Sequence, residues 1–132
     1  MTEPWDFARA VEAGRTASAR QRDAEQAVRD ASEDLADKER LYRVALAQQI
    51  VQQHANGAAW TVAQDLARGH DPVAELRYHR DVAKGVLEAA EQSAWRHTAD
   101  RKDVQEFLDW SKRASFLDTI PVDTPVIGRR AA

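Results

Sequence analysis

Residues 71–114 carry small and apolar side chains at a spacing that severely limits how this chain can fold. Six of them recur at seven-residue intervals: Leu76, Ala83, Ala90, His97, Val104 and Ser111. A second series follows four of these by three residues: His79, Val86, Ser93 and Phe107. Such alternation keeps one face of an α-helix turned toward a neighbouring helix, as in coiled coils. The stretch is therefore predicted to be one long helix that packs lengthwise, beginning with Asp71 as N-cap and Pro72 in the first turn.

A second long helix is predicted over residues 15–56. Residues 17–53 contain neither proline nor glycine, and acid-before-base pairs such as Glu39 and Arg43 support a helix at i, i+4 spacing. Val28, Leu35 and Tyr42 mark its seam. Residues 41–51 are apolar nearly all round, which predicts burial by more than one neighbour. Asn56-Gly57 is a typical helix stop.

Shorter elements are expected around these two helices. Residues 4–13 are predicted to form a separate first helix that ends at Gly14, because glycine often punctuates helices. Residues 61–68 are predicted to form a connecting helix capped by Thr61, with Trp60 as a hydrophobic staple. Residues 115–132 contain Pro121, Pro125 and Gly128, so an extended tail is expected there.

These elements predict an all-α fold. Two long helices of matched length and a compact connector favour a coiled-coil-like antiparallel hairpin. With 132 residues, the chain is long enough for one domain, expected over residues 1–114 with the tail outside it.

Composition argues against several functional classes. The chain has 19 basic and 22 acidic residues and a formal charge of −3, so electrostatic capture of nucleic acid is not favoured. It has no cysteine, and hence no disulfide framework or thiolate metal site. No apolar run approaches the ~20 residues of a membrane span, and the first residues do not resemble a signal peptide. We therefore expect a cytoplasmic protein that does not enter membranes.

The sequence contains no recognisable catalytic, cofactor or metal motif. Glu75 and His79 are spaced as Glu-x-x-x-His, once, whereas helical di-iron sites use Glu-x-x-His twice. His97 is interpreted as a polar seam residue that sets helix register. The serines have no nucleophile elbow, and the glycines form no phosphate loop. We expect a protein without catalytic residues, cofactor or metal.

A basic patch is a weaker candidate site. Arg77, Arg80 and Lys84 follow one another at i, i+3 and i+7 and could meet a phosphate backbone. Asp81 and Glu88 interrupt them, which favours an ordinary solvated helix face. Nucleic-acid binding therefore stays an alternative.

The aromatic residues indicate a candidate interface. Trp95 and Trp110 fall off the predicted seam, while Leu87 and Leu108 widen its apolar stripe on one flank. A lone hairpin cannot cover them, so we expect a homo-oligomer or another protein partner at this surface. The alternative is that other parts of this chain fold back over the tryptophans: Trp5 and Phe7 of the first helix, or Phe116 and Leu117 of the tail.

Residues 65–77, with the sequence Asp-Leu-Ala-Arg-Gly-His-Asp-Pro-Val-Ala-Glu-Leu-Arg, precede Asp81-Val82-Ala83. This segment resembles the sequences of small helical early-region proteins of actinobacterial phages and prophages, in which two long helices flank a short glycine-containing connector. The resemblance covers about residues 41–110. It implies a helical hairpin and supplies no catalytic residues.

Three functions are compatible with these features. The first is a non-enzymatic phage-type adaptor that presents helix faces to a protein partner and self-associates. The second is a nucleic-acid accessory factor in phage recombination or replication. The third is a virion or assembly scaffold component.

Overall fold

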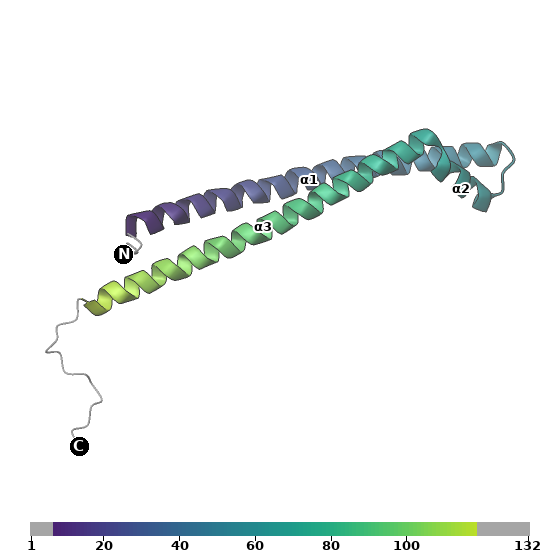
Figure 1. Ribbon diagram of the computed structural model, residues 1–132. Coiled ribbons are helices and arrows are strands. Elements are labelled where there is room, and N and C mark those ends of the chain that lie inside the picture. Colours follow the sequence, from purple (N-terminus) through teal and green to yellow (C-terminus); the bar gives the residue numbers. More distant parts are fainter. Residues whose placement is uncertain (1–6, 119–132) are drawn as a thin grey trace, which may run out of the picture.

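The computed structural model describes residues 7–118, which form three α-helices (Figure 1). Helix α1 spans Phe7–Ala55, α2 spans Trp60–Gly69 and α3 spans Asp71–Asp118. The two long helices run antiparallel side by side, and α2 folds back at the far end, where α1 turns toward α3. The predicted all-α helical hairpin is thereby confirmed.

The prediction of a separate first helix is wrong, because α1 continues through Gly14 without a break. A glycine in a helix costs about 1 kcal/mol against alanine, which good helix formers nearby can offset. Gly14 faces α3 and leaves room for a methyl group there. A Cβ atom built on Gly14 would lie 3.6 Å from Val104 Cγ1 and 3.6 Å from Leu108 Cδ1. The glycine therefore lies in the seam of the hairpin.

The predicted end of the long helix over residues 71–114 is also wrong. Helix α3 runs to Asp118, so residues 115–118 belong to the helix and not to a tail. Nothing in Ser115, Phe116 or Leu117 opposes helix formation, and the first proline comes only at position 121. The remainder of the predicted tail, residues 119–132, lies outside the described residues.

The turn between α1 and α2 closes as predicted at Gly57. This glycine has a φ of 102°, a left-handed conformation that side chains disfavour. Its N–H donates to the His54 carbonyl at 3.0 Å, and the Ala58 N–H donates to the Gln53 carbonyl at 3.1 Å. These bonds satisfy carbonyls that the helix end would leave unpaired.

The predicted caps of α2 and α3 are not observed. Ala59 is the N-cap of α2, without a side-chain hydrogen bond, so neither the Thr61 cap nor the staple role of Trp60 is seen. Trp60 instead opens the helix and stacks on His54, with ring centroids 3.6 Å apart. At α3, the His70 carbonyl accepts the Ala74 N–H at 2.9 Å. Asp71 therefore lies inside the first turn, where its carboxylate still interacts favourably with the helix dipole.

The core of the hairpin is thin and made of small residues. The buried apolar residues of the described chain are mostly alanines, and no large side chain among them is fully buried: Ala10, Ala24, Ala31, Tyr42, Ala63, Ala67, Val73 and Ala83. In contrast to the prediction, residues 41–51 are covered on one side only. Leu41, Val44 and Val51 are 46%, 50% and 60% exposed.

The predicted seam of α3 is correct for the first of its two series of residues. Ala83 is buried, and Leu76, Ala90, His97 and Val104 are half-buried, as the seven-residue series predicts. The second predicted series is wrong in part, because His79 and Val86 are exposed. The residues four positions after the series pack against α1 instead: Arg80, Leu87, Ala94 and Leu108.

Polar contacts across the hairpin fix its register. Gln21 Nε2 donates to Thr98 Oγ1 at 3.4 Å, and Arg101 Nη1 donates to Gln21 Oε1 at 3.1 Å. Nearer the turn, Arg80 lies 3.5 Å from the Glu39 carboxylate. Position 21 of α1 therefore faces positions 98–101 of α3, and position 39 faces position 80.

Candidate functional site

Large apolar side chains lie mainly on the outside of the hairpin. Trp95 is 73% exposed and Trp110 65%, as expected for residues off the seam. They belong to different flanks of α3, however. Trp110 lies four heptads after Val82, whereas Trp95 lies one heptad after Glu88. The two tryptophans therefore do not form one continuous surface.

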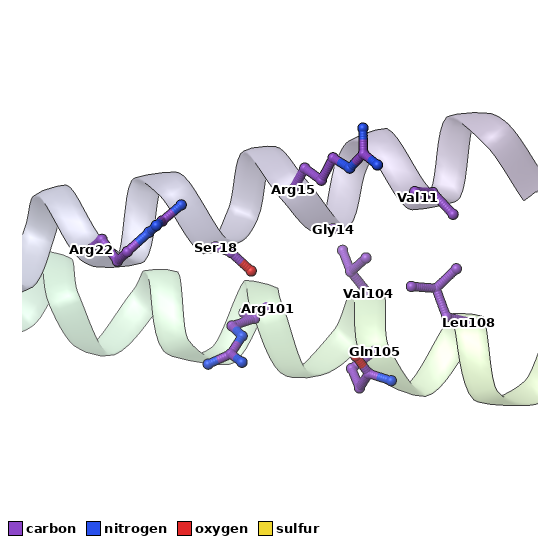
Figure 2. Close-up of a pocket in the computed structure, with 9 residues that line it drawn as sticks. All are labelled: Val11, Gly14, Arg15, Ser18, Arg22, Arg101, Val104, Gln105 and Leu108. Atoms are coloured by element: carbon purple, nitrogen blue, oxygen red, sulfur yellow. The ribbon is translucent and has the colours of Figure 1, made fainter.

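Leu87 and Leu108 do not belong to the outer surface proposed from the sequence. Both are half-buried in the seam with α1. Figure 2 shows Leu108 and Val104 pointing from α3 toward Gly14 of α1. Part of their apolar area is therefore covered within the monomer.

The predicted cover over the tryptophans is described only in part. Phe7 begins α1 and is 57% exposed, and Trp5 lies outside the described residues. The Phe107 and Trp110 rings are tilted neighbours with centroids 6.2 Å apart. Near the end of α3, Phe116 and Leu117 are 68% and 64% exposed.

A stripe of exposed residues on α3 was not recognised from the sequence as a surface. It includes Val82 and Val86, 47% and 55% exposed, and continues to Trp110. The sequence does contain a pattern for this stripe. Its residues recur at three- and four-residue spacing, each one position before a residue that faces α1. Sequence alone did not show which of the two series faces α1.

Of the basic residues Arg77, Arg80 and Lys84, the two arginines are engaged by acidic side chains of the same chain. Arg80 is engaged by Asp81 at 2.8 Å and by Glu39, and its guanidinium lies 4.6 Å from the centre of the Tyr42 ring. Arg77 also reaches Asp81, at 4.0 Å. These contacts direct the positive charge toward the protein's own acids.

The pair formed by Arg80 and Asp81 also changes their protonation equilibria. The hydrogen bond from Arg80 lowers the pKa of the Asp81 carboxyl, and the charges of Arg80, Arg77 and Lys84 lower it further. The same hydrogen bond raises the pKa of the Arg80 guanidinium. The two side chains therefore stay charged over the whole neutral range.

A different basic feature lies nearer the open end of the hairpin. A groove of about 340 Å³ runs between α1 and α3 there (Figure 2). Its lining includes three arginines and no carboxylate: Val11, Gly14, Arg15, Ser18, Arg22, Arg101, Val104, Gln105 and Leu108. The residues that line this groove therefore offer an anion positive charge and no carboxylate.

The histidines are engaged separately. His79 Nε2 lies 3.3 Å from Glu75, and His54 Nδ1 lies 2.9 Å from the Ala58 carbonyl oxygen. His97 is half-buried in the seam, where the sequence placed it. Within residues 7–118, no group of three or more His, Cys, Asp or Glu side chains is arranged to hold a metal ion.

No known protein family, curated protein or solved structure matches the chain. Along the described part of the chain, no helix combines the length and apolar character needed to cross a membrane. The two candidate functional features of the described residues are the exposed stripe of α3 and the arginine-lined groove.

Proposed function

We propose that this chain is a non-enzymatic, phage-type interaction protein that self-associates and presents helix faces to a protein partner. The observation that carries the proposal is the distribution of apolar side chains. The buried positions hold mainly alanine, whereas Val82, Val86 and Trp110 are about half exposed or more. Exposed apolar stripes on a helix are typical of surfaces that another chain covers.

Energetics support the same proposal. Ordering the backbone costs about 1–2 kcal/mol per residue, and burial of alanines returns little of that cost. Bundles of four helices offset it by covering a second apolar stripe on each helix. Central aromatic side chains contribute about 2 kcal/mol or more each in many interfaces. Trp110 fits such a role on the stripe that faces away from α1.

The turn end of the hairpin offers a second surface for a protein partner. Val62 and Leu66 of α2 are 50% and 48% exposed, while Ala63 and Ala67, each one position later, are buried. Trp60, which stacks on His54, is 53% exposed. An adaptor needs one surface for itself and another for its target. Self-association along the long helices would leave α2 available.

Sedimentation velocity over a wide concentration range tests self-association. We expect a mass above that of one 14.8 kDa chain at high concentration, with reversible dissociation on dilution. A chain that stays monomeric at every concentration would contradict the homo-oligomer. A virion or scaffold role would add a further result, the presence of the protein in purified particles.

A second candidate function, nucleic-acid accessory factor, is favoured by the arginine-lined groove. The binding of single- and double-stranded DNA at two salt concentrations tests it. Specific use of the groove predicts that Arg15→Ala together with Arg22→Ala weakens binding and reduces its dependence on salt. The matched control is Arg77→Ala, whose guanidinium contacts Asp81. Equal effects of the two changes would contradict a role for the groove.

A further inference from the structure

Helix α3 carries a second seam on one flank of the seam that packs against α1. Its members lie one position before the residues that pack against α1, which is about 100° around the helix. They alternate at four- and three-residue spacing over the length of α3: Glu75, His79, Val82, Val86, Ala89, Ser93, Arg96, Asp100, Asp103, Phe107, Trp110, Ala114 and Leu117. Sustained spacing of this kind is what a helix needs to pack lengthwise against a further helix.

The apolar and polar members of the second seam are arranged symmetrically about its middle. After the polar Glu75 and His79, the members between positions 82 and 89 are apolar, those between 93 and 103 are polar, and those between 107 and 117 are apolar again. A stripe with this order matches a copy of itself running in the opposite direction, since each apolar segment then meets the other apolar segment. In a parallel pair, Arg96 would meet Arg96 and Asp100 would meet Asp100, which is repulsive.

One antiparallel register fits both charge and size. When Arg96 of one copy faces Asp100 of the second copy, symmetry places the same pair on the other side of the axis. The same register sets Val86 opposite Trp110 and the small Ala89 opposite Phe107. A shift by one heptad would instead place Val86 opposite Asp103 and remove the charge pair. Complementarity therefore selects one alignment.

Arg96 and Asp100 are available for such a pair. Both are exposed, and among the ion pairs of the described residues neither takes part. Within one helix their base-before-acid order is the less favourable arrangement at i, i+4 spacing. A partner helix offers each of them the opposite charge at the same level.

Helix α1 supports the same axis independently. The two-fold axis would pass at the level of Thr98, midway between Arg96 and Asp100, and Thr98 is hydrogen-bonded to Gln21 of α1. Arg20 and Asp23 lie on either side of that level. Arg20 also shares a groove with Asp100, so this edge of α1 lies on the same face of the hairpin as the second seam. Two copies of α1 would then bring Arg20 of one opposite Asp23 of the other.

We propose that two copies of this chain pair antiparallel through the second seam of α3, with the axis at the level of Gln21 and Thr98. The proposal rests on the homo-oligomer proposed above and specifies its surface and direction. The paired region is a four-helix bundle formed by the open ends of the hairpins. The two turns, each with its α2, project from opposite ends.

Charge reversal tests the register. Arg96→Asp and Asp100→Arg should each weaken dimerisation about tenfold or more, because each places two pairs of like charges at the interface. The double variant Arg96→Asp with Asp100→Arg should restore the dimer toward the original affinity. Lys102→Asp, on the opposite flank of α3, is the matched control and should leave the affinity of dimerisation unchanged. Circular dichroism reports whether each variant remains helical.

Cysteine cross-linking tests direction, since the natural chain has no cysteine. A mixture of Val86→Cys and Trp110→Cys chains should join through a short thiol cross-linker. Each variant alone should not, because its two copies would lie about 36 Å apart. Cross-linking of each variant alone would indicate a parallel pair and overturn the proposal. A dimer that neither cross-links nor responds to charge reversal would overturn this interface alone, whereas an invariably monomeric chain would also overturn the homo-oligomer.

Discussion

Gly14 of α1 lies directly opposite Leu108 of α3, and a Cβ atom at position 14 would be 3.6 Å from the Leu108 Cδ1 atom. That separation is ordinary van der Waals contact. The position can therefore accept a methyl group without displacing its neighbours. The two helices approach closely here, but not so closely that glycine is required.

Gly14→Ala is expected to stabilise the protein by about 1–2 kcal/mol. About 1 kcal/mol comes from helix propensity, and the rest comes from burying one methyl group against Val104 and Leu108. Urea unfolding at fixed protein concentration measures the change. Gly85→Ala is the matched control, because nothing lies within 4 Å of its added Cβ atom and only propensity contributes. A loss of stability in Gly14→Ala alone would show that the helices are closer than described.

Gly57→Ala should have the opposite sign. Its φ of 102° is a conformation that an alanine adopts only at a cost of about 1–2 kcal/mol. Space is not the cause, since nothing lies within 4 Å of the added Cβ atom. The same urea experiment should show a lower free energy of unfolding. Unchanged stability would indicate that the turn adopts another conformation in solution.

The hairpin was predictable because its signals are local and repeated. The seven-residue series beginning at Leu76 and the stop at Gly57 each follow from the sequence alone. The helix break expected at Gly14 failed for a physical reason. The penalty of a single glycine is small, and the packing of α3 over that glycine is a tertiary effect that no local pattern contains.

The candidate surface was less predictable than the fold. Val86 and Leu87 are adjacent and both apolar, so periodicity alone could not decide which one faces α1. The choice depends on the partner helix, whose small residues at the seam accept Leu108 and its equivalents. For the same reason, the sequence could not show that Arg80 is held by Glu39.

The pair formed by Arg80 and Asp81 predicts a pH dependence. The pKa of Asp81 is lower in the folded chain than in the unfolded chain, where it is about 3.9. The unfolded state therefore binds more protons as the pH falls below that value. The contribution of Asp81 to stability is complete above the unfolded pKa and is lost as the pH falls through the folded value.

Carbon-detected NMR titration of the Asp81 carboxyl measures this directly. We expect a midpoint below the ordinary aspartate value, and a shift back toward it in Arg80→Gln, which removes the charged guanidinium that donates the hydrogen bond. Arg43→Gln is the control, because its guanidinium pairs with Glu39 and not with Asp81. An ordinary midpoint for Asp81 in the natural chain would show that the pair does not persist in solution.

The last prediction concerns Tyr42, the largest of the buried residues. It is 7% exposed, and the Arg80 guanidinium lies 4.6 Å from the centre of its ring. Tyr42→Ala should cost about 3–5 kcal/mol, as for other buried aromatics. Tyr42→Phe keeps the ring beneath the cation and should change stability by no more than about 0.5 kcal/mol.

Tyr42→Leu separates the two contributions at this position. Leucine keeps most of the buried apolar area but offers no aromatic face, so the loss relative to Tyr42→Phe should be about 0.5–2 kcal/mol. Adding Arg80→Gln to each variant completes the test. If the cation–π contact contributes, Arg80→Gln should cost more in the phenylalanine background than in the leucine background. Equal costs in both backgrounds would mean that Tyr42 stabilises the hairpin through burial alone.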